Sequence, residues 1–131
     1  FQTAATSPLY KGWLEAAPGI CQRVREAVLA RDFQQLGPAM EHSALVMHAT
    51  ALGADPGLVY WNGTTLEVIK EVRRMRKEGL ESYFTIDAGP HVKVLVEPAQ
   101  AAEICRRLEA VAGVLRTIVT KPGGAASVTA P

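Results

Sequence analysis

The stretch Asp87-Ala88-Gly89-Pro90 contains the residue types of this chain that are best suited to chemistry. It lies between two alternating apolar runs, residues 82–86 and 92–96, which are typical of strands. A carboxylate at a strand end can be held against a substrate, and the adjacent N–H groups of Ala88 and Gly89 can bind an anion such as a phosphate oxygen. Asp, Gly and Pro are also the common residues of hairpin turns. The residue types alone therefore favour an ordinary turn over a catalytic one.

His48 is the next residue with chemical capacity. It lies near the apolar face of a predicted helix, one turn from Ala44 and Ala51. With no second metal-type ligand nearby, a single histidine in such a place is more often a hydrogen-bonded packing residue than a catalyst. The run 73–77 places four positive charges at the C-terminal end of another helix, where the helix dipole favours cations. We predict a solvated helix face there and no metal site.

The periodicity of apolar residues predicts the elements that position these side chains. Pro-Gly and Gly-Pro pairs at 18–19 and 37–38 interrupt the helical pattern, and capping boxes are predicted at Asp32 with Gln35 and at 64–67. The predicted helices cover about 8–17, 20–31, 38–52, 64–78 and 98–112, and the predicted strands cover 58–61, 82–86, 92–96 and 114–119. This order predicts an α+β fold with a small antiparallel four-stranded sheet and helices packed on it.

Length and composition limit the class of protein. A chain of 131 residues suits one domain, 1–131, in which we expect 123–131 to be a flexible tail. The net charge of +1 gives no whole-chain reason to expect nucleic acid as a partner. Cys21 and Cys105 are far apart, so we predict neither a disulfide framework nor a zinc site. No apolar run approaches the ~20 residues that cross a bilayer. We therefore expect a cytoplasmic protein with no membrane partner, and the first residue, Phe1, suggests a piece of a longer chain.

Three segments together resemble one enzyme family. They are Met47-His48-Ala49-Thr50, then Tyr83 to Pro90 followed by Val92-Lys93-Val94, and the N-terminal Thr6 to Tyr10 with Trp13. In their order along the chain, these segments are similar to the C-terminal half of diphosphomevalonate decarboxylases, which belong to the GHMP kinase superfamily. The resemblance covers nearly the whole chain. It implies that 1–131 is the GHMP-type C-terminal domain of a two-domain enzyme.

The resemblance also implies a reaction. It favours a catalytic role for Asp87 over that of an ordinary turn residue. Asp87 would be the catalytic residue, close to the tertiary 3-hydroxyl of mevalonate 5-diphosphate, and would act as general base or orient that hydroxyl. Ala88 and Gly89 would bind the substrate diphosphate. His48 and His91 would contact the residues that bind the substrate and help to hold them in place. The implied reaction is phosphorylation of the hydroxyl by ATP, followed by loss of phosphate and carbon dioxide to give isopentenyl diphosphate.

The sequence departs from the family in two ways. His91 stands where the family usually has Asn, and a histidine changes both size and hydrogen-bonding capacity. The family binds ATP and Mg2+ mainly through an N-terminal half that this chain lacks, so we expect the isolated chain to be inactive. The implied partners are mevalonate 5-diphosphate, the protein's own N-terminal domain and a second copy in a homodimer. Two alternatives stay open: a related decarboxylase or kinase acting on mevalonate 5-phosphate or mevalonate, and a non-catalytic ligand-binding domain of the same fold.

Overall fold

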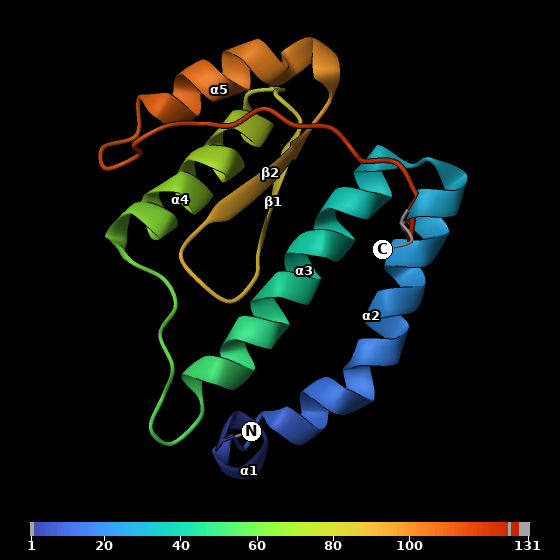
Figure 1. Ribbon diagram of the computed structural model, residues 1–131, viewed down its shortest axis with the longest axis vertical. Coiled ribbons are helices and arrows are strands. Elements are labelled where there is room, and N and C mark those ends of the chain that lie inside the picture. The colour runs from blue at the N-terminus through green and yellow to red at the C-terminus, as the bar shows by residue number, and fades with distance from the viewer. Residues whose placement is uncertain (1, 126, 129–131) are drawn as a thin grey trace.

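The fold is α+β and contains a two-stranded antiparallel sheet with several helices. The computed structural model describes residues 2–125 and 127–128 (Figure 1). In chain order the elements are α1 (Gln2–Thr6), α2 (Tyr10–Ala30), α3 (Phe33–Leu52), α4 (Gly63–Lys77), β1 (Ser82–Ile86), β2 (Val92–Val96), a 3-10 turn (Pro98–Gln100) and α5 (Ala101–Glu109). Figure 1 shows α2 and α3 side by side, with the hairpin of β1 and β2 between α3 and α4. Packing contacts join α2 to α3, and both α3 and α4 to β1.

Helix α2 passes through Pro18 without a break, so the predicted division into two helices is wrong. A proline inside a helix removes one backbone hydrogen bond. The lost bond is tolerated because α2 packs against α3. Trp13, Ala17 and Ile20 continue in phase with Val24 and Ala27, at spacings of four and three residues. This stripe runs through the proline and is typical of a single helix.

Helix α3 also begins earlier than predicted, at Phe33, and Pro38 lies inside it. The predicted cap at Asp32 is confirmed, because its carboxylate accepts from the backbone N–H of Gln35 at 2.9 Å. The side chain of Gln35 returns a bond to the same carboxylate. A cap of this kind fixes the first turn, so the helix can start before the proline.

The hydrophobic core lies between α4, the hairpin and α5. The predicted stripe of α4 is buried, and Phe84 and Ile86 of β1 are almost fully buried against it. The cap of α4 is Asn62 rather than Thr64: the Asn62 side chain accepts from the backbone N–H of Thr65, and Thr65 Oγ1 accepts from the Asn62 N–H. Gly79, with φ of +92°, follows the end of the helix, where a residue with a side chain would be strained.

Two of the four predicted strands form in the part of the chain that the structure describes. β1 and β2 pair with the register Ser82 to Val96 and Ile86 to Val92. Residues 58–61 and 114–119 have no regular secondary structure, and their backbones form no ladder with β2. Side-chain packing holds 58–61 instead, because Trp61 lies against the core. The model therefore shows the central hairpin and does not show a four-stranded sheet.

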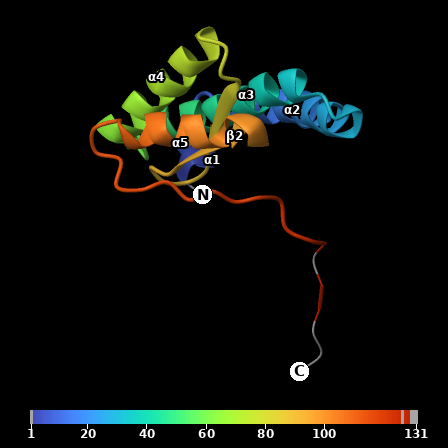
Figure 2. The same cartoon turned by 90° about the horizontal axis from the view of Figure 1, so that it is seen from above.

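The C-terminal segment crosses the hairpin and then leaves the body of the domain (Figure 2). Its described residues after 120 are exposed and irregular. The predicted flexible tail, 123–131, includes residues 126 and 129–131, which lie outside the described residues. Among the residues that are described, no helix has both the length and the apolar character needed to cross a bilayer.

Candidate functional site

Asp87 is the first residue after β1 and lies on the surface. Its side chain is 77% exposed, and its Oδ2 atom is 2.6 Å from Nζ of Lys93. The ion pair follows from the register of the hairpin. Lys93 pairs with Thr85, which makes it the diagonal neighbour of Asp87 on the same face of the sheet. Because both side chains are largely exposed, the pair is screened by water and leaves the carboxylate available to a ligand.

The turn after Asp87 presents free backbone donors. The N–H groups of Ala88 and Gly89 donate no hydrogen bond to any residue that the structure describes. Gly89 has φ of +136°, a conformation in which any residue with a Cβ would be strained. Free N–H groups in a turn can bind an anion. The geometry therefore fits the anion site that the sequence suggested at these two residues.

Side chains from two helices hold the two ends of this turn. His48 Nε2 lies 3.2 Å from the carbonyl oxygen of Ile86, directly before Asp87. A carbonyl can only accept, so the hydrogen bond requires the proton on Nε2. At the other end, Thr65 Oγ1 donates to the carbonyl oxygen of Pro90 at 3.0 Å. His48 is buried, as its place on the apolar face predicted, and its ring packs against those of Tyr60 and Trp61.

Asp87 and Ala88 line a pocket of about 350 Å³, here called the Asp87 pocket. Its walls bring together segments that are far apart in the sequence. They come from the N-terminal region, from α3 and from the segment before α4, and the other lining residues are Thr3, Tyr10, Trp13, Met47, Thr50, Ala51 and Tyr60. All three segments on which the family resemblance was based thus contribute to one pocket. Thr50 lines the pocket, but its hydroxyl proton is not available to a ligand, because the hydroxyl donates to backbone carbonyls of its own helix.

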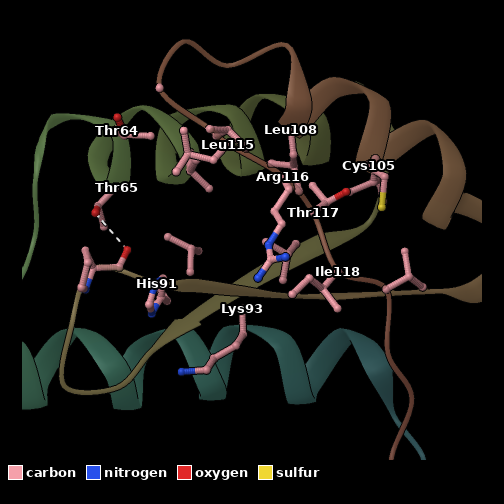
Figure 3. A pocket seen from close by; sticks show the side chains of 18 of the residues that line it. Thr64, Thr65, His91, Lys93, Cys105, Leu108, Leu115, Arg116, Thr117 and Ile118 are labelled. Atoms are coloured by element: carbon pink, nitrogen blue, oxygen red, sulfur yellow. Dashed lines mark hydrogen bonds between the residues drawn. The ribbon is translucent and has the colours of Figure 1, made fainter.

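His91 lies apart from this pocket. It is exposed and lines a larger cavity of about 870 Å³ between β2, α4, α5 and the C-terminal segment. Figure 3 shows His91 in this cavity with Thr65 and Arg116, while the side chain of Lys93 points toward α3. The structure therefore brings His48, Asp87 and Ala88 together and leaves His91 on another side of the turn.

The outer edge of β1 is bound by side chains rather than by another strand. The backbone groups of residues 82, 84 and 86 that point away from β2 meet Arg76, Glu41 and His48 in turn. Glu41 is buried, accepts from the Phe84 N–H at 3.1 Å and pairs with Arg76 at 2.8 Å. Arg76 also lies over the Tyr83 ring, 4.6 Å from its centroid. The prediction of a solvated face for the run 73–77 is wrong for Arg76, which bridges α3, α4 and β1.

Sequence reasoning assigned no role to Lys93, Glu41 or Thr65. Lys93 could have been noticed as the only charged residue within the apolar run 92–96, but its diagonal position to Asp87 depends on the pairing of Ile86 with Val92. The spacing of Glu41 and His48, seven residues or two helical turns, also places both on one face of α3. No local pattern signals the bond from Thr65 to Pro90, because the two residues are 25 positions apart.

No group of three or more His, Cys, Asp or Glu side chains among the described residues could hold a metal ion. The Asp87 pocket therefore offers one carboxylate, one neighbouring ammonium group and a turn with free N–H donors. This set can orient and deprotonate a hydroxyl group and can bind a phosphate oxygen.

Comparison with known proteins decides the family. The family model described as "Mevalonate 5-diphosphate decarboxylase C-terminal domain" matches residues 1–125. The chain belongs to this family. Solved structures agree with its fold: the mevalonate diphosphate decarboxylase from Enterococcus faecalis is 40% identical with a TM-score of 0.80, and the match covers 86% of this chain and 35% of that one. A complex of the enzyme abbreviated MDDEF with MVAPP, AMPPCP and magnesium is 39% identical with the same coverage and a TM-score of 0.80.

Curated relatives of this decarboxylase domain carry two related activities. Diphosphomevalonate decarboxylase of Candida albicans is 26% identical over 103 residues, which cover 78% of this chain and 28% of the relative. Phosphomevalonate decarboxylase of Haloferax volcanii is 30% identical over 92 residues, which cover 70% of this chain and 28% of the relative. The chain thus spans well under half the length of the relatives that it matches.

Proposed function

We propose that this chain is the C-terminal domain, residues 1–131, of a two-domain enzyme that decarboxylates mevalonate 5-diphosphate with ATP. The main support is the Asp87 pocket, where the three segments typical of the family meet around one exposed carboxylate. The substrate class comes from relatives whose names or bound ligands include mevalonate diphosphate.

Asp87 is the proposed catalytic residue. Its carboxylate accepts the proton of the tertiary 3-hydroxyl or orients that hydroxyl toward the phosphoryl donor. ATP supplies the phosphoryl group that turns the hydroxyl into a leaving group. Loss of phosphate takes the bonding electron pair from carbon 3, and release of carbon dioxide returns a pair to form the double bond of isopentenyl diphosphate. A fixed carboxylate also favours the positive charge that develops on carbon 3.

Ala88 and Gly89 are the proposed substrate-binding residues. Their N–H groups have no hydrogen-bond partner in the described part of the chain and can donate to the substrate diphosphate. His48 supports the site from behind through its bond to Ile86. In this proposal His91 does not contact the substrate, because it lines the larger cavity on another side of the turn.

The proposed cofactors are ATP and Mg2+, bound mainly by an N-terminal half. The described residues of this chain contain no cluster of acidic or histidine ligands for the metal, which is consistent with that division. The proposed partners are therefore this N-terminal domain and a second copy in a homodimer. We also propose a cytoplasmic location, because the phosphorylated substrates and ATP are water-soluble.

The same proposal includes a larger sheet in the intact enzyme. In the intact enzyme, residues 58–61 and 114–119 would complete a four-stranded sheet with β1 and β2. Leu115 is 97% exposed and Ile118 is 72% exposed, and burial in a sheet would remove both from water. Slow amide exchange across 114–119 in the full-length protein would support this arrangement, and exchange at the rate of an unfolded peptide would exclude it.

The second candidate is decarboxylation of mevalonate 5-phosphate, which is favoured by the relative from Haloferax volcanii named phosphomevalonate decarboxylase. The two substrates differ only in the terminal phosphate. The turn 87–89 carries donors for phosphate oxygens but has no buried cation that would select between one phosphate and two.

One assay of the full-length protein tests both candidates. Purified enzyme with ATP and Mg2+ is given mevalonate, mevalonate 5-phosphate or mevalonate 5-diphosphate, and release of phosphate and carbon dioxide is measured. We expect both products from the diphosphate. Both products from the monophosphate alone would favour the second candidate, and neither product from any substrate would favour a non-catalytic domain.

A further inference from the structure

Among the described residues, the backbone of the turn that carries Asp87 is held only at its two ends, and Lys93 contacts the Asp87 carboxylate itself. Within the described residues, the turn 87–90 contains no internal backbone hydrogen bond, and the N–H groups of Ala88 and Gly89 have no partner. A turn of this kind can shift as a unit. Because the ion pair with Lys93 is exposed and therefore weak, the place of the Asp87 carboxylate depends mainly on the contacts that flank the turn.

A buried side chain from a different helix makes each of these contacts. His48 of α3 binds the Ile86 carbonyl, and Thr65 of α4 donates to the Pro90 carbonyl at 3.0 Å. The side chains of both residues come from well-packed helices, and each residue is only 2% exposed. Groups held by packing can fix a site more tightly than groups on a loop.

The hydroxyl of Thr65 contacts the cap of α4 as well as Pro90. The backbone N–H of Thr65 donates to Asn62 Oδ1 at 2.9 Å, and its hydroxyl oxygen accepts from the Asn62 N–H at 3.3 Å. The hydroxyl has one proton and lies 3.0 Å from both Asn62 Oδ1 and the Pro90 carbonyl oxygen. Asn62 Oδ1 has a second donor in the backbone N–H of Thr65, whereas the Pro90 carbonyl has no other donor among the described residues, so a proton directed at Pro90 satisfies both acceptors.

We infer that Thr65 is a positioning residue for the proposed reaction, on which this inference rests. By holding Pro90, and with His48 holding Ile86, it fixes the turn and so the place of the Asp87 carboxylate. Pro90 is exposed, so water can replace the hydroxyl on its carbonyl when Thr65 is changed. Loss of the bond should therefore loosen the turn more than it destabilises the fold. Since a misplacement of ~1 Å can cost about 100-fold in rate, the effect should appear in kcat.

The test is Thr65→Val in the full-length protein, because valine keeps the shape of threonine and removes its hydroxyl. We expect kcat for carbon dioxide release to fall by about tenfold or more, with the KM for ATP nearly unchanged. Thr65→Ser restores the hydroxyl, and kcat should return to within about threefold of the parent.

Two control variants separate positioning from stability. Asn62→Ala breaks the cap of α4 but leaves the bond from Thr65 to Pro90, so it should lower the melting temperature and leave kcat unchanged. Thr64→Val makes the same chemical change one residue earlier, at a hydroxyl with no hydrogen-bond partner among the described residues. It should also leave kcat unchanged.

Two results would overturn the inference while leaving the proposed function in place. They are a kcat for Thr65→Val close to the parent value, and an equal loss of kcat in Asn62→Ala. If the parent protein releases no carbon dioxide, the proposed function fails, and amide exchange then decides the role of Thr65. Exchange across 87–91 should be faster in Thr65→Val than in Asn62→Ala, and equal rates would contradict the role.

Discussion

At the scale of residues, the environment of Asp87 differs from that of an ordinary hairpin turn. A simple hairpin turn needs its polar residues only to bond one another or water. Here two buried side chains, His48 and Thr65, bind the carbonyls on either side of the turn, and the N–H groups of Ala88 and Gly89 have no partner in the part of the chain that the structure describes. Burying polar side chains is costly unless they are satisfied, so their use at this turn indicates that its position matters.

Asp87→Asn in the full-length protein tests the proposed catalytic role. The amide keeps the size of the side chain but cannot accept a proton. Because general base catalysis contributes roughly 100-fold or more, we expect most of the turnover to be lost while ATP affinity stays nearly intact. Carbon dioxide release and ATP binding are the two measurements.

Asp55→Asn is the matched control, because Asp55 is also exposed but lies outside the Asp87 pocket. It should leave turnover unchanged. A turnover within a few-fold of the parent in Asp87→Asn would contradict the catalytic role.

At the scale of elements, α3 is the helix that organises the site. It supplies Glu41 and His48 to the outer edge of β1, and Gly37 to its contact with Tyr83. A Cβ atom at Gly37 would overlap the Tyr83 ring. The glycine therefore allows α3 to approach β1 closely enough for both side chains to reach the strand.

Gly37→Ala tests this close approach. Alanine favours a helix over glycine by about 1 kcal/mol. Overpacking costs about 1–3 kcal/mol. The Tyr83 ring is already packed between Phe33 and Arg76, so we expect the cost of the overlap to exceed the gain in helix propensity. We expect a net loss of stability in urea unfolding of the chain.

Gly19→Ala in α2 provides the matched comparison, because no atom lies within 4 Å of a Cβ at that position. The same change should there raise stability by about 0.5–1 kcal/mol. If both variants were stabilised, the close packing of α3 on Tyr83 would be contradicted.

The stabilisation that the cap of α3 gives to the fold should decrease at acidic pH. The backbone N–H of Gln35, and then its side chain, hold the pKa of Asp32 below its ordinary value of 3.8. A carboxyl with a lowered pKa in the folded state stabilises the fold above its unfolded pKa, and this contribution is lost as the pH falls through the folded value. Asp32→Asn retains a capping oxygen but does not titrate.

The difference in unfolding free energy between the parent chain and Asp32→Asn should therefore shrink between pH 7 and pH 3. Urea unfolding at both pH values measures it. A difference that stayed constant would show that the charge of Asp32 does not act on the helix.

At the scale of the whole molecule, the Asp87 pocket is small for the reaction that we propose. The Asp87 pocket has a volume of about 350 Å³, and it contains one carboxylate but no cluster of metal ligands among the described residues. A site for mevalonate 5-diphosphate, ATP and Mg2+ together needs more surface and more charge than this wall provides. We therefore expect the rest of such a site to come from another domain.

The isolated chain of 131 residues should therefore be inactive. We expect no ADP release when it is given mevalonate 5-diphosphate, ATP and Mg2+, and weak ATP binding by calorimetry. The full-length protein serves as the positive control. ADP release by the isolated chain, absent from its Asp87→Asn variant, would contradict the division of the site between two domains.

The sequence by itself determined the features that depend on local patterns. It located the strands 82–86 and 92–96, the buried stripe of α4, the cap at Asp32 and the turn at Asp87, because apolar periodicity and turn residues act over a few positions. Its motifs also indicated the family, which the comparisons confirmed. Local signals at Pro18 and Pro38 misled, because packing along a neighbouring helix can compensate for one lost hydrogen bond.

Only the tertiary structure decided which distant residues meet at the turn. His48 reaches Ile86 across 38 positions, Thr65 reaches Pro90 across 25, and Glu41 reaches Phe84 across 43. These bonds form because α3 and α4 pack on β1, and hydrogen bonds need distances and angles that no sequence spacing specifies. The fold thereby joins three separate motifs into one pocket and places His91, the neighbour of the turn in sequence, outside it.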